Sequence, residues 1–206
     1  MRVTLDIPSD QLARLVTPAV AEPRIPLDAV TWEQYEALLA AMGDRPRLRL
    51  TYLAGTLEIM TISPEHEMLK KMIARLVEIY ALEKDIALFS SGSATYRKQA
   101  AARGLEPDES YCIGSRKEFP DLAIEVVIIS GGIDKLEVYK GLNISEVWYW
   151  QDGKLTVHQL HSDRSEYVVI QRSALLPELD LELLAAHIRP EDEPQAVKAF
   201  RNAICL

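Results

Sequence analysis

The stretch from Leu122 to Ile129 constrains the fold more than any other part of the sequence. It reads LAIEVVII, so every residue is apolar except Glu125. A nearly continuous apolar run rich in β-branched residues is typical of a strand that is covered on both faces. It therefore predicts the central strand of a sheet with helices packed around it, which is an α/β architecture.

The segments around this strand alternate between helical and strand periodicity. Thr31 and Gln34 predict a capping box that opens a helix, and Asp152-Gly153 predicts a tight hairpin turn. We expect helices over residues 32–42, 64–84, 134–142, 179–187 and 194–203. We expect further strands over residues 48–53, 56–62, 86–90 continuing towards Tyr96, 108–113, 146–150, 155–160 and 167–171.

From Pro64 to Trp150 the expected order is helix, three strands, helix, strand, an αβββαβ core with a mixed central sheet. An N-terminal helix and hairpin precede this core, and a hairpin and helices follow it. We predict a single domain over residues 31–206, with the core at about 64–150 and a helical tail at about 178–206. The first 30 residues carry four prolines, which favours an N-terminal arm over residues 1–30. Val3 and Leu5 are candidates for an edge strand there.

Acidic residues mark the candidate site. A carboxylate inside an apolar strand is costly to bury unless it binds a cation or is hydrogen-bonded, so Glu125 requires a partner. If Asp108 lies beside it on a neighbouring strand, two carboxylates converge on one hard cation such as Mg²⁺ or Mn²⁺. Asp121 shares a strand face with Glu125 and is the third candidate ligand.

Hydrolysis of a phosphate ester at such a metal site, in which water attacks the phosphorus, also uses a lysine near the attacking water. The position two residues after Glu125 is Val127, so an E-x-K triplet is absent. Lys135, after the Gly131-Gly132 turn, is the candidate replacement. Each candidate has an alternative interpretation. Glu125 could pair only with a basic residue, Asp108 suits a turn, and Asp121 could satisfy backbone amides at the start of a strand. Lys135 suits a solvated helix, and Glu67 suits the first turn of a helix.

Several motifs together resemble the Uma-two family of restriction endonuclease-like proteins in the PD-(D/E)XK nuclease superfamily. They are SPEHE (63–67), EPDES (106–110), PDLAIEVV (120–127), SGGIDKLEVYKGLNISEVWYW (130–150) and DGKL (152–155). The resemblance covers roughly residues 31–159. It implies a restriction-endonuclease-like αβββαβ core and a Mg²⁺- or Mn²⁺-dependent endonuclease that hydrolyses DNA. It also implies Asp108, Asp121, Glu125 and Lys135 as site residues, with Glu67 or His66 as an acid-bearing position on the long helix.

Composition narrows the classes of partner. The net charge of -8 disfavours non-specific binding to a polyanion such as DNA. Two cysteines far apart and the lack of a recognisable secretory leader favour a reducing cytoplasm. No apolar run approaches the roughly 20 residues that cross a bilayer, so we expect no integral membrane protein. His158 and His161 suggest a zinc site only superficially, because no third ligand is evident.

Two alternatives remain open. The chain is either an active nuclease or an inactive nuclease-fold module that binds nucleic acid or protein. A third, weaker hypothesis is a structural homodimer formed through the apolar C-terminal residues Phe200, Ile204 and Leu206.

Overall fold

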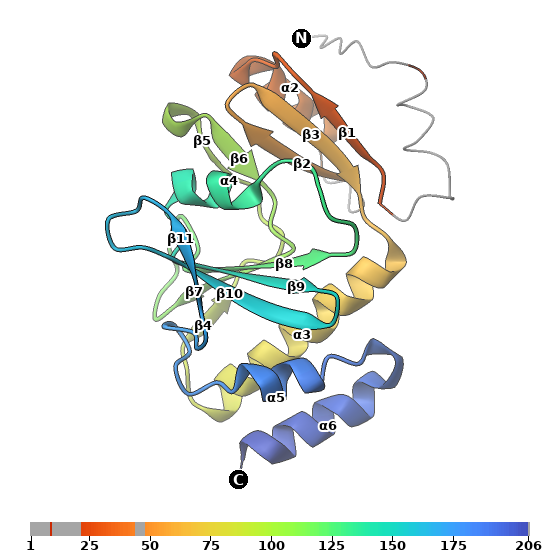
Figure 1. Ribbon diagram of the computed structural model, residues 1–206, viewed down its shortest axis with the longest axis vertical. Helices are drawn as coiled ribbons and strands as arrows, with labels where there is room; N and C mark the ends of the chain where they lie inside the picture. Colours follow the sequence, from red (N-terminus) through yellow and green to blue (C-terminus); the bar gives the residue numbers. More distant parts are fainter. Residues whose placement is uncertain (1–8, 10–21, 44–47, 206) are drawn as a thin grey trace. The chain divides into compact units, whose positions relative to one another are not determined.

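The computed structural model describes residues 9, 22–43 and 48–205 (Figure 1). The chain divides into two compact units, and each contains one sheet. Unit 1 consists of Met1–Ser63, Thr95–Glu106 and Ile128–Leu142, and unit 2 consists of Pro64–Ala94, Pro107–Val127 and Asn143–Leu206. The edge strand considered for Val3 and Leu5 lies outside the described residues.

Unit 1 is built on an antiparallel sheet with the strand order β1-β3-β2-β6-β5. Its strands are β1 (Arg24–Leu27), β2 (Leu48–Leu53), β3 (Thr56–Thr61), β5 (Tyr96–Lys98) and β6 (Arg103–Leu105). Its helices are α2 (Trp32–Met42), α4 (Lys135–Leu142) and the short 3-10 helix η1 (Gln99–Ala101). Helix α4 packs against β2, β5 and β6.

The N-terminal helix of unit 1 forms as its sequence predicts. The Gln34 amide donates to the Thr31 hydroxyl and the Thr31 amide donates to Gln34 Oε1 at 2.8 Å, which completes the capping box. Tyr35 then enters the core and stacks on Tyr52 of β2 with ring centroids 4.9 Å apart. Gly104 of β6 leaves room for the Tyr35 ring, because a Cβ there would collide with it.

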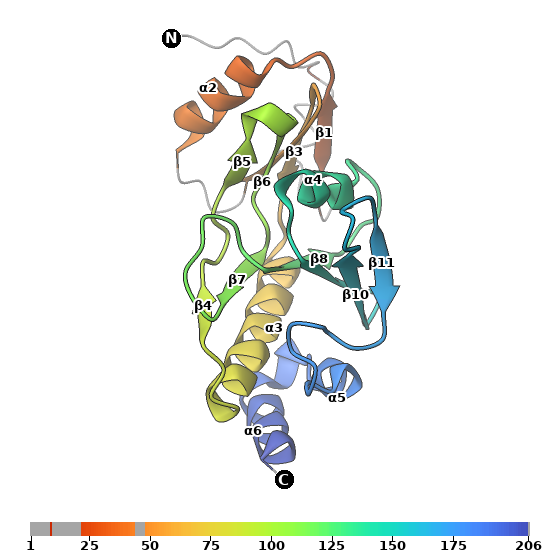
Figure 2. The ribbon, with the colours of Figure 1, turned by 90° about the vertical axis from the view of Figure 1, so that its left-hand side faces the viewer.

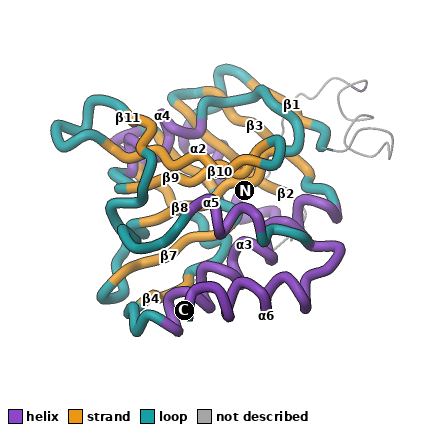
Figure 3. Tube along the Cα trace, turned by 60° about the horizontal axis from the view of Figure 1, so that its bottom comes forward, coloured by secondary structure: helices purple, strands orange, loops and turns teal. Residues whose placement is uncertain are grey.

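Unit 2 is built on a six-stranded mixed sheet with the order β11-β10-β9-β8-β7-β4. Its strands are β4 (Leu88–Ser90), β7 (Glu109–Ile113), β8 (Leu122–Val127), β9 (Glu146–Gln151), β10 (Lys154–Leu160) and β11 (Tyr167–Ile170). Its helices are α3 (Pro64–Glu83), α5 (Leu181–Ala186), α6 (Glu193–Ile204) and the 3-10 helix η2 (Pro190–Asp192). Helix α3 packs against β8 and lies alongside α6 (Figures 2 and 3).

The sequence prediction for the central strand is confirmed. β8 is an interior strand that pairs antiparallel with β7 and parallel with β9. The fold is therefore a mixed α/β fold, consistent with a restriction-endonuclease-like core. Asp152 and Gly153 both have positive φ, 50° and 73°, as the tight turn of the β9–β10 hairpin requires.

Some details differ from the sequence prediction. The first strand of the expected core, predicted to continue towards Tyr96, ends at Ser90 as β4, and the chain then contributes β5 and β6 to unit 1. Strand β7 begins at Glu109, so Asp108 precedes it instead of lying within it. Part of the predicted arm forms β1, an edge strand that tolerates Pro26 because a proline at an edge removes no interior hydrogen bond.

The C-terminal tail packs within unit 2. Phe200 and Ile204 of α6 are buried, and α6 packs against α3. These two side chains are therefore unavailable for the dimer surface considered from the sequence, and Leu206 lies outside the described residues.

Candidate metal and active site

Asp108 and Glu125 come from neighbouring segments of the sheet in unit 2. The β7–β8 register pairs Glu109 with Ile124. One residue further along, the same register puts Asp108 opposite Glu125. The Val126 amide donates a hydrogen bond of 2.8 Å to Asp108 Oδ2. Asp108 and Glu125 both have 0% exposure, so two buried acids lie in facing positions at one end of the β7–β8 pair.

His66 contacts Asp108 directly. Its Nε2 atom lies 2.8 Å from Asp108 Oδ1, and the imidazole is fully buried. The residue sits in the first turn of α3, which begins at Pro64. Because Val126 binds one oxygen of Asp108 and His66 contacts the other, the carboxylate is held in one orientation. Buried acidic groups need such polar contacts to offset lost hydration.

A buried lysine lies one helical turn beyond His66. Lys70 is only 4% exposed, and its Nζ donates to Glu67 Oε1 at 2.8 Å. Glu67, the acid suggested by the family resemblance, is thus engaged with a neighbour on its own helix. Lys70 is not among the site residues predicted from the sequence. The available signal was the spacing of Lys70 along α3. His66, Ile73 and Val77 are buried, and Lys70 recurs with them at helical spacing on the same face.

A third buried acid, Glu109, directly follows Asp108 in the sequence. Lys71 Nζ donates to Glu109 Oε1 at 3.1 Å. Burial raises the pKa of the Glu109 carboxyl, and the hydrogen bond and positive charge of Lys71 oppose that rise. The first two turns of α3 therefore supply both polar and cationic groups to the segment that carries Asp108.

Asp121 lies at the other end of β8 from Glu125. Its Oδ2 accepts hydrogen bonds from the Ile113 amide at 2.8 Å and from Lys117 Nζ at 2.5 Å. Four extended residues span about 13 Å. The structure therefore does not bring the Asp121 carboxylate together with that of Glu125. Its contacts close the loop between β7 and β8.

Lys135 is the first residue of α4 and belongs to unit 1. Val127, at the lysine position of an E-x-K triplet, is the last residue of β8 in unit 2. A role for Lys135 at the acidic centre stays a prediction from the family resemblance.

The histidines of the β10 region have other contacts. The His158 ring lies edge-on to Tyr149 with centroids 5.4 Å apart, and His161 Nδ1 lies 2.9 Å from Asp163 Oδ1. Across residues 22–43 and 48–205, no group of three or more His, Cys, Asp and Glu side chains has an arrangement that could hold a metal ion.

The donor chemistry at Asp108 and Glu125 nevertheless suits a small hard cation. Mg²⁺ prefers oxygen ligands, and proteins commonly bind it through one or two carboxylates with water and substrate phosphate completing the shell. A pair of buried carboxylates on adjacent segments meets that requirement without a third protein ligand.

The mixed α/β fold, with its two sheets, is consistent with the class of restriction-endonuclease-like proteins. A model of the Uma2 family, described as "Putative restriction endonuclease", matches residues 32–189, and the chain belongs to this family. A comparison with curated protein sequences found no match. Among the described helices, none combines the length and the apolar character needed to cross a membrane.

Proposed function

We propose that this protein is an endonuclease that hydrolyses DNA phosphodiester bonds with Mg²⁺ or Mn²⁺ held by Asp108 and Glu125. The observation that carries the proposal is the pair of fully buried carboxylates opposite each other on the β7–β8 register. Family membership supports the reaction class. Asp121 has no part in this proposal, because Lys117 and the Ile113 amide engage its carboxylate.

The residues of unit 2 have separable roles in this reaction. A hard divalent cation, when bound, stabilises negative charge on the phosphate and lowers the pKa of bound water. Asp108 and Glu125 provide the carboxylate oxygens that hold it. His66 and the Val126 amide orient Asp108, and contacts of this kind typically change metal affinity or activity by about 10- to 100-fold.

The first test is cleavage of supercoiled plasmid and of linear duplex by the whole chain with Mg²⁺, with Mn²⁺ and with chelator. Glu125→Gln and Asp108→Asn should each lower the rate by more than about 100-fold, since even outer contacts of a metal site are worth about 10- to 100-fold. Asp121→Asn, one residue before β8, is the control and should retain cleavage. Equal rates for wild type and Glu125→Gln would refute the proposal.

A second test asks which lysine assists the reaction. Lys70 is buried beside His66 on α3, and Lys135 occupies the position that the resemblance implies. Lys70→Met and Lys135→Met, assayed in parallel on the same plasmid, separate the two. Loss of cleavage in one variant alone, with metal affinity retained, assigns the role to that lysine.

A second candidate function follows from Val127. Without a lysine two residues after Glu125, the same scaffold could serve as a binding module that does not turn over substrate. Titration calorimetry with Mn²⁺ distinguishes the two functions. The endonuclease takes up metal in a manner that depends on Asp108 and Glu125, whereas a binding module retains duplex binding when both residues are replaced.

A further inference from the structure

Asp108 lies just outside the regular part of the sheet in unit 2. Strand β7 begins one residue later, and its pairing with β8 starts at Glu109. On the other side of β7, the pairing with β4 reaches only as far as Tyr111, which faces Ser90. Neither ladder includes Asp108. The main chain that carries this proposed metal ligand therefore needs another restraint.

The chain that follows β4 continues beside this segment but bends at Gly92. Gly92 has a φ of 55°, in the left-handed region that glycine adopts without strain. Before the bend, the Ser91 amide still donates to the Ser110 carbonyl at 2.9 Å. At the bend, Ser110 Oγ donates to the Gly92 carbonyl at 2.8 Å, and Ser93 Oγ donates to the Asp108 carbonyl at 2.9 Å. Two serine hydroxyls thus hold the segments together where backbone pairing stops.

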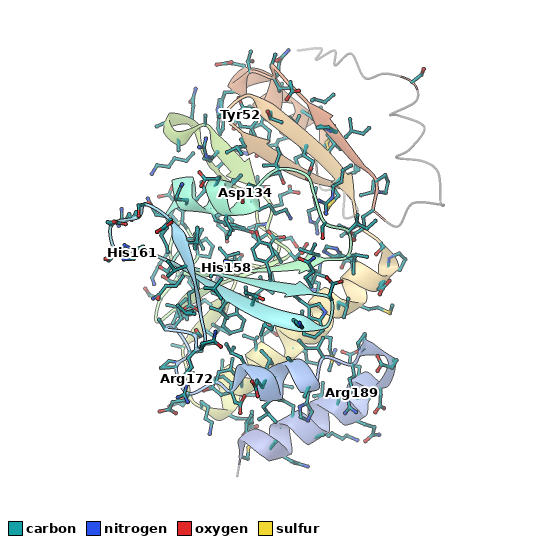
Figure 4. All side chains as sticks on the ribbon, in the orientation of Figure 1. Tyr52, Asp134, His158, His161, Arg172 and Arg189 are labelled. Carbon is teal, nitrogen blue, oxygen red and sulfur yellow. The ribbon has the colours of Figure 1, made fainter. Side chains whose placement is uncertain are left out.

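The carboxylate of Asp108 is oriented by different groups. Side chains fill the layer between α3 and the sheet of unit 2 (Figure 4). From α3, His66 Nε2 lies 2.8 Å from Asp108 Oδ1, and from β8 the Val126 amide donates to Oδ2 at 2.8 Å. The carboxylate can keep both contacts only while its main chain stays in place. The hydrogen bond from Ser93 restrains that main chain from the side of β4.

We infer that Ser93 is a positioning residue for Asp108, whose main chain it holds so that the carboxylate keeps the orientation that binds a divalent cation. The inference rests on the proposed function, because it takes Asp108 as a metal ligand. Groups that orient a ligand typically change metal affinity by about 10- to 100-fold. Ser93 acts on the carbonyl of Asp108 and not on its carboxylate, so we expect the lower end of that range.

Hydrogen exchange of the metal-free protein, followed by NMR, tests whether Ser93 holds Asp108. In Ser93→Ala the Val126 amide, which donates to the Asp108 carboxylate, should exchange several-fold faster than in wild type. The Ile124 amide, two residues earlier on β8, should keep its rate, whereas a general loss of stability would accelerate both amides. Ser91→Ala is the matched control. Ser91 is half-buried in the same loop and contacts Ser110 through a backbone amide that alanine retains, so both rates should stay unchanged.

Titration calorimetry with Mn²⁺ tests the consequence for metal binding. Ser93→Ala should bind Mn²⁺ about 10-fold more weakly than wild type, at the same stoichiometry. Ser93→Thr keeps a hydroxyl and should restore both the Mn²⁺ affinity and the Val126 exchange rate, while Ser91→Ala should bind like wild type. Ser110→Ala removes the other hydroxyl contact of the loop and should change both measurements in the same direction as Ser93→Ala. It provides the test if Ser93→Ala does not fold.

The possible outcomes separate this inference from the proposed function. An unchanged Val126 rate in Ser93→Ala, or an equal acceleration of Val126 and Ile124, overturns the inference. It is also overturned if wild type binds Mn²⁺ through Asp108 and Ser93→Ala binds it equally well. A wild-type protein that takes up no Mn²⁺ refutes the proposed function, and the role of Ser93 in metal binding with it. The exchange rates of the metal-free protein then still decide whether Ser93 holds Asp108.

Discussion

Glu146 illustrates how a single buried acid organises unit 2. Its carboxylate accepts hydrogen bonds from Trp148 Nε1 at 2.9 Å, from Ser173 Oγ at 2.7 Å, and from the amides of Ala174 and Leu175 at 2.6 and 3.1 Å. These donors lie within β9 and in the segment before α5. One fully buried side chain therefore ties the connection after β11 to the interior of the sheet.

We predict that Glu146→Gln lowers the free energy of unfolding by about 2 to 4 kcal/mol, because an amide NH₂ group would face donors that now have an acceptor. Urea denaturation measures the change. Glu191→Gln, at an exposed acid in η2, is the control and should alter stability by less than about 0.5 kcal/mol. A Glu146→Gln protein as stable as this control would assign the carboxylate no structural role.

Cys205 provides a second prediction at the residue scale, through its contact with Glu83. The thiol donates to Glu83 Oε2 at 3.4 Å. This hydrogen bond, with smaller contributions from burial and the negative charge of Glu83, raises the pKa of the Cys205 thiol above its ordinary value. A raised thiol pKa leaves less thiolate near pH 8, so Cys205 should alkylate slowly there.

Glu83→Gln removes that charge and should lower the Cys205 pKa, so that iodoacetamide labelling at pH 8 becomes several-fold faster. Mass spectrometry of the labelled peptide separates Cys205 from buried Cys112. Glu65→Gln, at an exposed acid near the start of α3, should leave the rate unchanged. The same rate in all three proteins would contradict the role assigned to Glu83.

At the scale of elements, the capping box of α2 yields a quantitative prediction. Thr31→Ala removes the acceptor for the Gln34 amide and should lower the free energy of unfolding by about 1 kcal/mol. Thr31→Ser keeps a hydroxyl at the cap and should have a much smaller effect. Chemical denaturation of the three proteins measures both changes, and equal losses from Ala and Ser would indicate that the methyl group, not the cap, matters.

Elements with local signals were predictable from the sequence. The cap at Thr31, the Asp152-Gly153 turn and the apolar run of β8 each depend on residues close together in the chain, and all three form as predicted. β1 and β6 were missed, because Pro26 interrupts one and Gly104 the other, and their pairing comes from distant strands.

The candidate site was predictable to a similar extent. Glu125 was predicted because it is the single acid in the apolar sequence of β8. Asp108 was predicted from the Pro107-Asp108 pair in EPDES. The contact between His66 and Asp108 joins residues that are far apart in the chain, and no periodicity encodes such a contact. Lys70 was missed because lysine is rarely buried, so a lysine on the buried face of a helix is easily assigned to solvent.

At the scale of the whole molecule, the chain passes repeatedly between the two units. Each unit is assembled from three separate segments, and neither corresponds to one continuous stretch of sequence. Within unit 1, β3 and β6 both pair with β2, although residues of unit 2 separate β3 from β6 in the chain. If unit 2 unfolded first, that connection would become a long flexible loop whose closure costs conformational entropy.

This connectivity predicts that residues 31–206 unfold as a single domain. Native-state hydrogen exchange in increasing urea measures the free energy at which each amide opens. The slowest amides of β3 in unit 1 and of β9 in unit 2 should converge on one value, and on one dependence on urea. Two distinct values, with unit 1 opening while β9 stays protected, would contradict a single domain. They would also show that the three segments of unit 2 hold their sheet together while unit 1 is open.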